Sequence, residues 1–242
     1  MSCEVKLLRY SDPHRKHLAH AAAVYLGKPD TDNVRRPLAM IKKRDALNIF
    51  RGESARFEFK ASKVVYDHLV TYTTANMRAC GGLRANVASE FVMPPEAIGT
   101  GYEDSLRKDG EAALEAYQWH INGIDPATSE RKEKARLQAA RAVAPMSVKL
   151  HFIIEFNFAT LAEALFPQRI WTPGAQLDTY QVVMAMWDLL CQQDPELWDT
   201  FYTYYGPDFR TWAAAYGRML REDPITLRTI LNRYPQRSMW DK

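Results

Sequence analysis

Three arginines lie beside predicted loops or at the ends of predicted helices, where a long charged side chain can reach a ligand. Arg84 follows a pair of glycines, Arg141 comes shortly before Pro145, and Arg169 lies within residues 167–174. A guanidinium group is planar and permanently charged, so it suits phosphate or the edge of a base. These arginines therefore indicate a site for a small anionic ligand; the alternative is that each is an ordinary surface residue.

The pair Gly81 and Gly82 lies between a predicted helix and Arg84. Glycine has no Cβ, so the main chain at such a pair can approach a ligand closely. Cys80 precedes the pair and has the chemistry of a nucleophile that attacks an electron-poor carbon. The alternative for Cys80 is a small, buried apolar side chain.

Two groups of histidines suggest further sites. His68 and Tyr72 are four residues apart on a predicted helix and share a face, so they either line a pocket or pack against a strand. His14, His17 and His20 are three apart, and each step turns them by about 60° around a helix. His14 and His17 are neighbours but lack a third metal ligand in register, so we favour a solvated polar face and predict no metal site.

The composition is that of an ordinary globular protein. The 242 residues are 47% hydrophobic and 25% charged, and 32 Lys and Arg against 29 Asp and Glu give a net charge of +3. Such a small excess of positive charge argues against nucleic acid as a partner. Phosphate loops, dinucleotide fingerprints, hydrolase elbows and zinc spacings are absent from the sequence.

Cysteine usage and hydropathy bear on where the protein works. Cys3, Cys80 and Cys191 are odd in number and far apart, which argues against a disulfide framework. Residues 1–30 lack the apolar core of a signal peptide, and no uncharged run approaches the length of a membrane span. We therefore expect a soluble, unprocessed cytoplasmic protein.

Hydrophobic periodicity divides the chain into strands and helices. Alternation predicts strands over residues 5–10, 55–61 and 148–156, the last of them central. Helical spacing predicts helices over residues 13–26, 37–50, 62–74, 103–121, 129–142, 157–166 and 175–193, and a largely helical stretch over 195–242. Residues 76–86 and 167–174 are expected to be loops. Asp12 and Ser62 are expected to cap helices, Pro13 to begin one and Gly27 to end one.

This order of elements predicts one α+β domain, in which helices flank a central mixed or antiparallel sheet. We assign residues 1–193 to the domain and residues 194–242 to a helical C-terminal extension. The extension is rich in aromatic residues, which makes it a candidate interface or lid.

Several stretches in this order resemble the flavin-dependent thymidylate synthases, the ThyX-type enzymes that methylate dUMP with a reduced flavin and methylenetetrahydrofolate. The stretches are VKLLRYSDP, FEFKASKVVYDHLV, the later PP, ARAVAP leading into KLHFIIEFN, and Arg169 followed by Ala175 and Gln176. Together they cover residues 5–193. The resemblance implies a ThyX-like fold for this domain.

The resemblance implies roles for four residues. Asn157 matches the family asparagine at the end of the central strand, near the flavin. Arg141 matches an arginine that binds the nucleotide, and Arg169 matches, with a one-residue offset, the arginine that faces the pyrimidine. His68 takes the place of a glutamine that contacts the nucleotide.

The family signature is altered in this chain. Thr71, Tyr72 and Thr73 stand where the family has Arg-His-Arg, and Gly81 stands where a serine follows. With one residue inserted, Arg84 matches the arginine of the family's Ser-x-Arg-Tyr and can still hold a phosphate. The changes remove two arginines and a histidine from the flavin surface, where charge-assisted contacts are worth about 1.5–3 kcal/mol each.

Three interpretations follow. The chain is a divergent flavin-dependent enzyme that transfers a one-carbon unit to C5 of dUMP or a related pyrimidine deoxynucleotide; or it is a flavin-independent nucleotide hydroxymethylase or alkyltransferase in which Cys80 adds to C6; or it is a non-catalytic nucleotide-binding paralogue. The resemblance implies FAD, methylenetetrahydrofolate as donor, NADPH as a candidate reductant and a homotetramer. The candidate residues are Arg169 and Cys80 for catalysis; His68, Gly81, Gly82, Arg84, Arg141 and Arg169 for the nucleotide; and Thr71, Tyr72, Thr73 and Asn157 for the cofactor.

Overall fold

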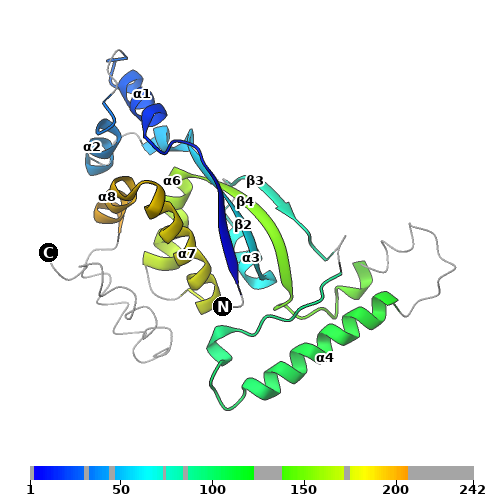
Figure 1. Cartoon of the computed structure of the whole chain (residues 1–242). Coiled ribbons are helices and arrows are strands. Elements are labelled where there is room, and N and C mark those ends of the chain that lie inside the picture. The colour runs from blue at the N-terminus through cyan, green and yellow to red at the C-terminus, as the bar shows by residue number, and fades with distance from the viewer. Residues whose placement is uncertain are drawn as a thin grey trace, which may run out of the picture.

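The computed structural model of the chain describes residues 3–29, 33–43, 47–72, 75–83, 87–122, 138–171 and 175–206. Within these residues, one antiparallel sheet contains β1 (Glu4–Tyr10), β2 (Ser54–Ser62), β3 (Ala75–Cys80) and β4 (Lys149–Asn157). Their order is β1-β2-β4-β3, so β2 and β4 are the inner strands (Figure 1). The predicted α+β class and the central place of the third predicted strand are confirmed.

Helices pack on one face of this sheet and lie at its ends. The α-helices are α1 (Lys16–Tyr25), α2 (Arg36–Lys43), α3 (Lys63–Val70), α4 (Glu103–Asn122), α6 (Phe158–Thr160), α7 (Leu177–Gln193) and α8 (Pro195–Tyr205). Shorter 3-10 turns are η1 (Leu47–Arg51) and η2 (Pro95–Ala97), and π-helical turns are η3 (Leu161–Leu165) and η4 (Pro167–Trp171). No described helix combines the length and hydropathy needed to cross a membrane.

The inner strands alternate buried and partly exposed side chains, as their sequence predicts. Phe57 and Phe59 on β2 and Phe152 and Ile154 on β4 are at most 1% exposed and share one face. Phe59 lies opposite Phe152, and their rings stack with centroids 4.8 Å apart. Helix α3 packs on this apolar face, where Tyr66 meets Phe152 edge to face, and α7 packs beside α3.

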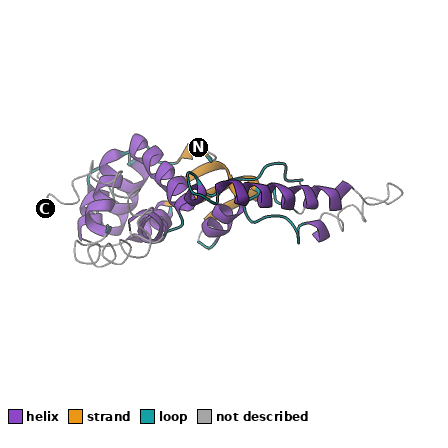
Figure 2. Ribbon diagram, turned by 90° about the horizontal axis from the view of Figure 1, so that it is seen from below, coloured by secondary structure: helices purple, strands orange, loops and turns teal. Residues whose placement is uncertain are grey.

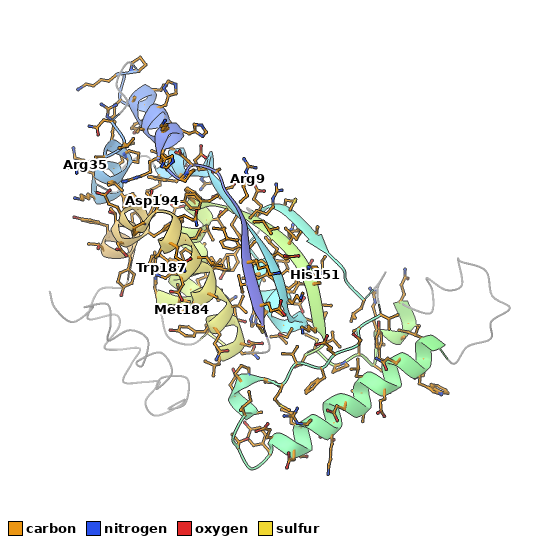
Figure 3. All side chains as sticks on the ribbon, viewed as in Figure 1. Arg9, Arg35, His151, Met184, Trp187 and Asp194 are labelled. Atoms are coloured by element: carbon orange, nitrogen blue, oxygen red, sulfur yellow. The ribbon has the colours of Figure 1, made fainter. Side chains whose placement is uncertain are left out.

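The opposite face of the sheet carries charged side chains that pair across the strands. Arg56 Nη2 lies 2.6 Å from Glu155 Oε2, and Nε2 of His151, which Figure 3 labels, lies 2.7 Å from Glu58 Oε1. Cross-strand pairs of this kind neutralise much of the local charge. This face therefore offers no broad positive field to a polyanion.

Residues 76–86, expected to be a loop, contain strand β3. Its backbone pairs with β4, with Ala75 opposite Phe156 and Cys80 opposite Phe152. The prediction was wrong because an edge strand takes its hydrogen bonds from a partner distant in sequence, and this short segment shows little alternation of its own. Residues 84–86 lie outside the described part of the chain.

Helix α1 begins later than predicted. The Asp12 carboxylate accepts hydrogen bonds from the backbone N–H groups of Lys16 at 2.8 Å and Leu18 at 2.9 Å, so Asp12 serves the helix start as expected. Pro13, however, lies in a turn before the helix, and Arg15 at the N-cap has φ of 56°. Ser62 caps α3 as expected, because its Oγ accepts a hydrogen bond from Val65 N, a backbone donor at the helix start.

Three predicted helices have different limits. The helix over 37–50 is seen as α2 and η1, with residues 44–46 outside the described part. The helix predicted over 62–74 ends at Val70. Most of the helix predicted over 129–142 falls within residues 123–137, which lie outside the described part. Gly27 ends the first helix at φ +66°, a conformation that glycine adopts without strain.

Helix α8 belongs to the core. Trp198 and Phe201 are fully buried, and Trp198 Nε1 donates a hydrogen bond of 3.2 Å to the Tyr10 hydroxyl. Arg15 Nε lies 3.0 Å from the carboxylate of Asp194, which Figure 3 labels at the end of α7. The described part of the aromatic segment is therefore packed inside the protein and is not a lid; residues 207–242 lie outside the described part.

Helix α4 lies apart from α1, α2 and α8, at the other end of the sheet (Figures 1 and 2). It is anchored to the segment before it, where Gln118 Nε2 donates 3.2 Å to the Ala88 carbonyl and Tyr117 is fully buried. Gly110 faces the ring of Phe91 so closely that a Cβ at position 110 would lie 2.7 Å from Phe91 Cδ2. This close approach explains why a glycine stands inside α4.

We predict that Gly110→Ala destabilises the protein by about 1–2 kcal/mol, although the same change in an open helix is stabilising by about 1 kcal/mol. The overlap with Phe91 supplies the difference. In a Phe91→Leu background, the alanine is expected to stabilise α4 again. Urea unfolding of the four proteins measures both effects. Stabilisation by Gly110→Ala in both backgrounds would show that the contact is not restrictive.

Candidate functional site

Of the predicted site residues, the structure brings His68, Tyr72 and Arg169 together. His68 lies in the last turn of α3, whereas Tyr72 comes two residues after the helix ends at Val70, so Tyr72 is not on the helix face that the spacing predicted. Arg169 Nε donates a hydrogen bond of 2.9 Å to the Tyr72 hydroxyl, and its Cζ lies 5.8 Å from the centre of the Tyr72 ring. The Tyr72 hydroxyl in turn donates 3.1 Å to Gln168 Oε1. These contacts fix the direction of the guanidinium plane.

Arg169 belongs to the π-helical turn η4, where a loop was predicted. The segment stays wound because Ile170 and Trp171 are 2% and 1% exposed and anchor it in the core. Arg169 itself is only partly buried. Within the described part of the chain, Nε is the guanidinium nitrogen that has a hydrogen-bond partner, and both Nη groups are available to a ligand.

A chain of hydrogen bonds supports His68 from behind. Its Nδ1 lies 2.7 Å from Thr179 Oγ1 at the start of α7. The Thr179 hydroxyl lies 3.3 Å from Asp178 Oδ1, and Asp178 Oδ2 accepts 3.0 Å from Ser62. Ser62 also caps α3. Sequence reasoning missed Thr179 and Asp178; the signal was two polar residues at the start of an otherwise apolar, buried helix.

The electrostatics of the site leave one positive charge. Burial lowers the pKa of His68, and the nearby Arg169 guanidinium lowers it further, against the opposite pull of Asp178 and Asp67. Burial raises the pKa of Tyr72, although Arg169 opposes this. At neutral pH, His68 is therefore neutral and Tyr72 is protonated, while Arg169 is charged.

Cys80 lies on the other side of α3. It ends β3 and is partly buried beside Tyr66, which is two residues before His68 and so about 200° away around the helix. Burial raises the pKa of the Cys80 thiol, and the hydrogen bond with Tyr66 offsets this only in part. A raised pKa reduces the thiolate fraction at neutral pH, which is the opposite of what a nucleophile needs.

The diglycine continues the sheet for one step, because Gly81 N donates 3.0 Å to the His151 carbonyl. Gly82 has no left-handed backbone, and a Cβ there would make an ordinary contact of 3.8 Å with Cys80 Sγ. The structure of the protomer thus leaves room beside Gly82. Arg84 and Thr73 lie outside the described residues.

Asn157 and Arg141 lie at opposite ends of β4. Asn157 is 6% exposed and caps α6, with its Oδ1 accepting 2.8 Å from Thr160 N. Arg141 has an exposed side chain in the turn before the strand, whereas Asn157 ends the strand. None of the described contacts joins Arg141 to His68, Tyr72 or Arg169. The described contacts thus give no link between Arg141 and Arg169 within one protomer.

A second cluster involves His17, for which no third ligand was expected. Ligand atoms of Asp12, His17 and Glu53 lie within 4.8 Å of one another, with His17 Nδ1 3.4 Å from Glu53 Oε1. Asp12 uses both oxygens to cap α1, and Glu53 accepts a hydrogen bond from Ser11. These bonds account for the cluster as a cap that ties α1 to the start of β2.

One family model matches most of the chain. No curated protein matches the sequence. The family model described as thymidylate synthase complementing protein matches residues 6–196, which include α3, β4, η4 and α7 with all the contacts of the site. The chain belongs to this family, the ThyX-type thymidylate synthases.

Proposed function

We propose that this protein transfers a one-carbon unit to C5 of a pyrimidine deoxynucleotide, with dUMP as the expected substrate. Membership of the family supports a thymidylate synthase-like activity in general. The observation that carries the proposal is the Arg169 guanidinium, which Tyr72 orients and which keeps its Nη groups available beside the neutral His68.

The chemistry of such a site follows from its charge. C5 of a pyrimidine attacks the one-carbon donor as a carbon nucleophile, and the forms of the ring that make C5 nucleophilic carry negative charge on the carbonyl oxygens. A fixed guanidinium directed at a carbonyl stabilises that charge, since it is already oriented and never loses its proton. The resemblance implies that Arg169 faces the pyrimidine, and Tyr72 would then act by holding Nε.

The residues at the candidate cofactor positions do not fit the flavin contacts that the family implies. Thr71 bonds back to the His68 carbonyl at 2.7 Å, and Tyr72 is engaged with Arg169. Asn157 Oδ1 caps α6. None of these three described residues offers a positive charge to FAD. A folate donor and an NADPH reductant remain expectations from the resemblance.

This misfit favours a second candidate function, a flavin-independent transferase on the same fold. Cys80 is not favoured as its nucleophile, because it lies across α3 from Arg169 and its pKa is raised by burial. A non-catalytic nucleotide-binding paralogue differs from both candidates in forming no product.

The family resemblance also implies a homotetramer whose sites draw residues from several subunits. We extend this to Arg141, which is exposed and distant from Asn157 along β4. In a site shared between subunits, Arg141 of one copy would complete the nucleotide pocket that contains Arg169 of another.

The first prediction about the site concerns nucleotide binding. Arg169→Gln should weaken dUMP binding about 10- to 100-fold, because one charge-assisted interaction of about 1.5–3 kcal/mol is lost. Tyr72→Phe keeps the ring and loses only the hydroxyl, so its effect should be smaller. Isothermal titration measures both affinities. The matched control is Arg107→Gln on α4, whose arginine pairs with Glu103. Equal affinities for wild type and Arg169→Gln would contradict the proposal.

The second prediction concerns flavin. The wild-type protein should purify colourless and take up little added FAD. The variant with both Thr71→Arg and Thr73→Arg should bind FAD at least tenfold more tightly, since two charged contacts are restored. Absorbance in the flavin bands and fluorescence quenching measure binding, and Thr71→Gln with Thr73→Gln is the uncharged control. A yellow, stoichiometric wild-type flavoprotein would overturn the misfit argument.

The third prediction tests the shared site. Arg141→Gln and Arg169→Gln should each abolish turnover, whereas subunits unfolded together and refolded as a mixture should recover about a quarter of the sites. Turnover of dUMP with methylenetetrahydrofolate is the measurement. Recovery requires that one intact site forms from two different copies. A mixture that stays inactive, although it assembles, would place both arginines in one subunit or show that Arg141 has no role.

A further inference from the structure

The hydrogen bonds behind His68 specify which of its ring nitrogens carries a proton. Asp178 is 4% exposed in the first turn of α7, where the helix dipole favours negative charge. Its carboxylate accepts from the Thr179 backbone N–H at 2.6 Å and from Ser62 at 3.0 Å. Every one of these partners is a donor, so Asp178 has only acceptor sites to offer to the Thr179 hydroxyl.

The Thr179 hydroxyl has one proton and two neighbours that could take it. Thr179 is fully buried, so water does not provide an alternative partner. A hydrogen bond to a carboxylate is stronger than one to a neutral nitrogen, and Thr179 Oγ1 lies within reach of Asp178 Oδ1 at 3.3 Å. With its proton on that side, Oγ1 accepts from His68, and the 2.7 Å contact makes Nδ1 the donor.

We propose that Thr179 and Asp178 are positioning residues that hold His68 as the neutral Nδ1–H tautomer, so that Nε2 presents an unprotonated acceptor to the ligand. The group that meets His68 is then a hydrogen-bond donor and not a phosphate oxygen. In dUMP, the available donors are the N3–H of the base and the 3′-hydroxyl of the sugar.

The surroundings of His68 keep this acceptor free of a second proton. Arg169 on η4 is the cation that faces the ring, while Asp178 on α7 and Asp67 on α3 itself oppose its effect, and Tyr72 is protonated and neutral. Within the described residues, Nδ1 is the ring nitrogen with a hydrogen-bond partner. Arg169 thus offers charged hydrogen-bond donors to the ligand, and His68 offers a neutral acceptor.

The tautomer is tested directly by nitrogen NMR of the full-length protein labelled with ¹⁵N-histidine at neutral pH, with the His68 signals assigned through His68→Gln. We expect Nδ1 in the protonated range and Nε2 in the unprotonated range. Thr179→Val, which keeps the shape and removes the hydroxyl, should shift the ring toward the Nε2–H form, and Thr179→Ser should restore the wild-type pattern. Nε2–H in the wild type, or no difference between the variants, would overturn the proposal.

The ligand part rests on the proposed function and is measured by titration with three nucleotides. Binding of dCMP, which lacks N3–H, or of 2′,3′-dideoxyuridine monophosphate, which lacks the 3′-hydroxyl, should be about three- to tenfold weaker than that of dUMP. The analogue that binds more weakly than dUMP identifies which group donates to His68. Its loss of affinity relative to dUMP should vanish in His68→Leu. If both analogues bind as tightly as dUMP, no donor meets His68 and this part is wrong.

The pH dependence has a defined sign. Because the neutral ring is the competent form and its pKa is lowered, dUMP affinity should be constant through neutral pH and decline only below the ordinary histidine range. A decline that starts above neutral pH would contradict a neutral acceptor. The NMR result does not depend on turnover, so an inactive protein with the Nδ1–H tautomer would refute the proposed function and leave this inference standing.

Discussion

The hydroxyl of Ser62 is the point on which the geometry of the site depends. It accepts a hydrogen bond from Val65 N and so begins α3, and it donates to Asp178 and so fixes the start of α7 against the end of β2. Since β2 is an inner strand, this one group ties both helices to the rigid centre of the sheet. The Ser62–Asp178 hydrogen bond holds α3 and α7 together near the point where His68 Nδ1 lies 2.7 Å from Thr179 Oγ1.

The position of Arg169 depends on buried apolar side chains that do not themselves belong to the site. Arg169 reaches Tyr72 because η4 is wound and held by Ile170 and Trp171, which the aromatic cluster around Trp187 encloses. Side chains that lie fully in the core hold the backbone of η4 in place while Arg169 stays partly exposed. A polar contact that is precise at the surface thus depends on apolar packing beneath it.

The parts of this structure that sequence could predict are those with local causes. The alternation in β2 and β4 and the cap at Ser62 follow from periodicity or from a hydrogen bond within a few residues. Strand β3 could not be predicted, because its pairing is supplied by a strand more than seventy residues away. The contact between His68 and Thr179 is equally non-local, and only the fold places the two together.

The same distinction explains why Arg169 and Arg141, similar in sequence context, differ in the protomer. Each follows a helical segment, but Arg169 is fixed by Tyr72 whereas Arg141 is exposed at the far end of β4 from Asn157. An exposed charged side chain such as that of Arg141 either binds no ligand or binds one that a second molecule also contacts. We propose a neighbouring copy as that second molecule, since a symmetric assembly can present the exposed Arg141 of one subunit to the ordered Arg169 of the next.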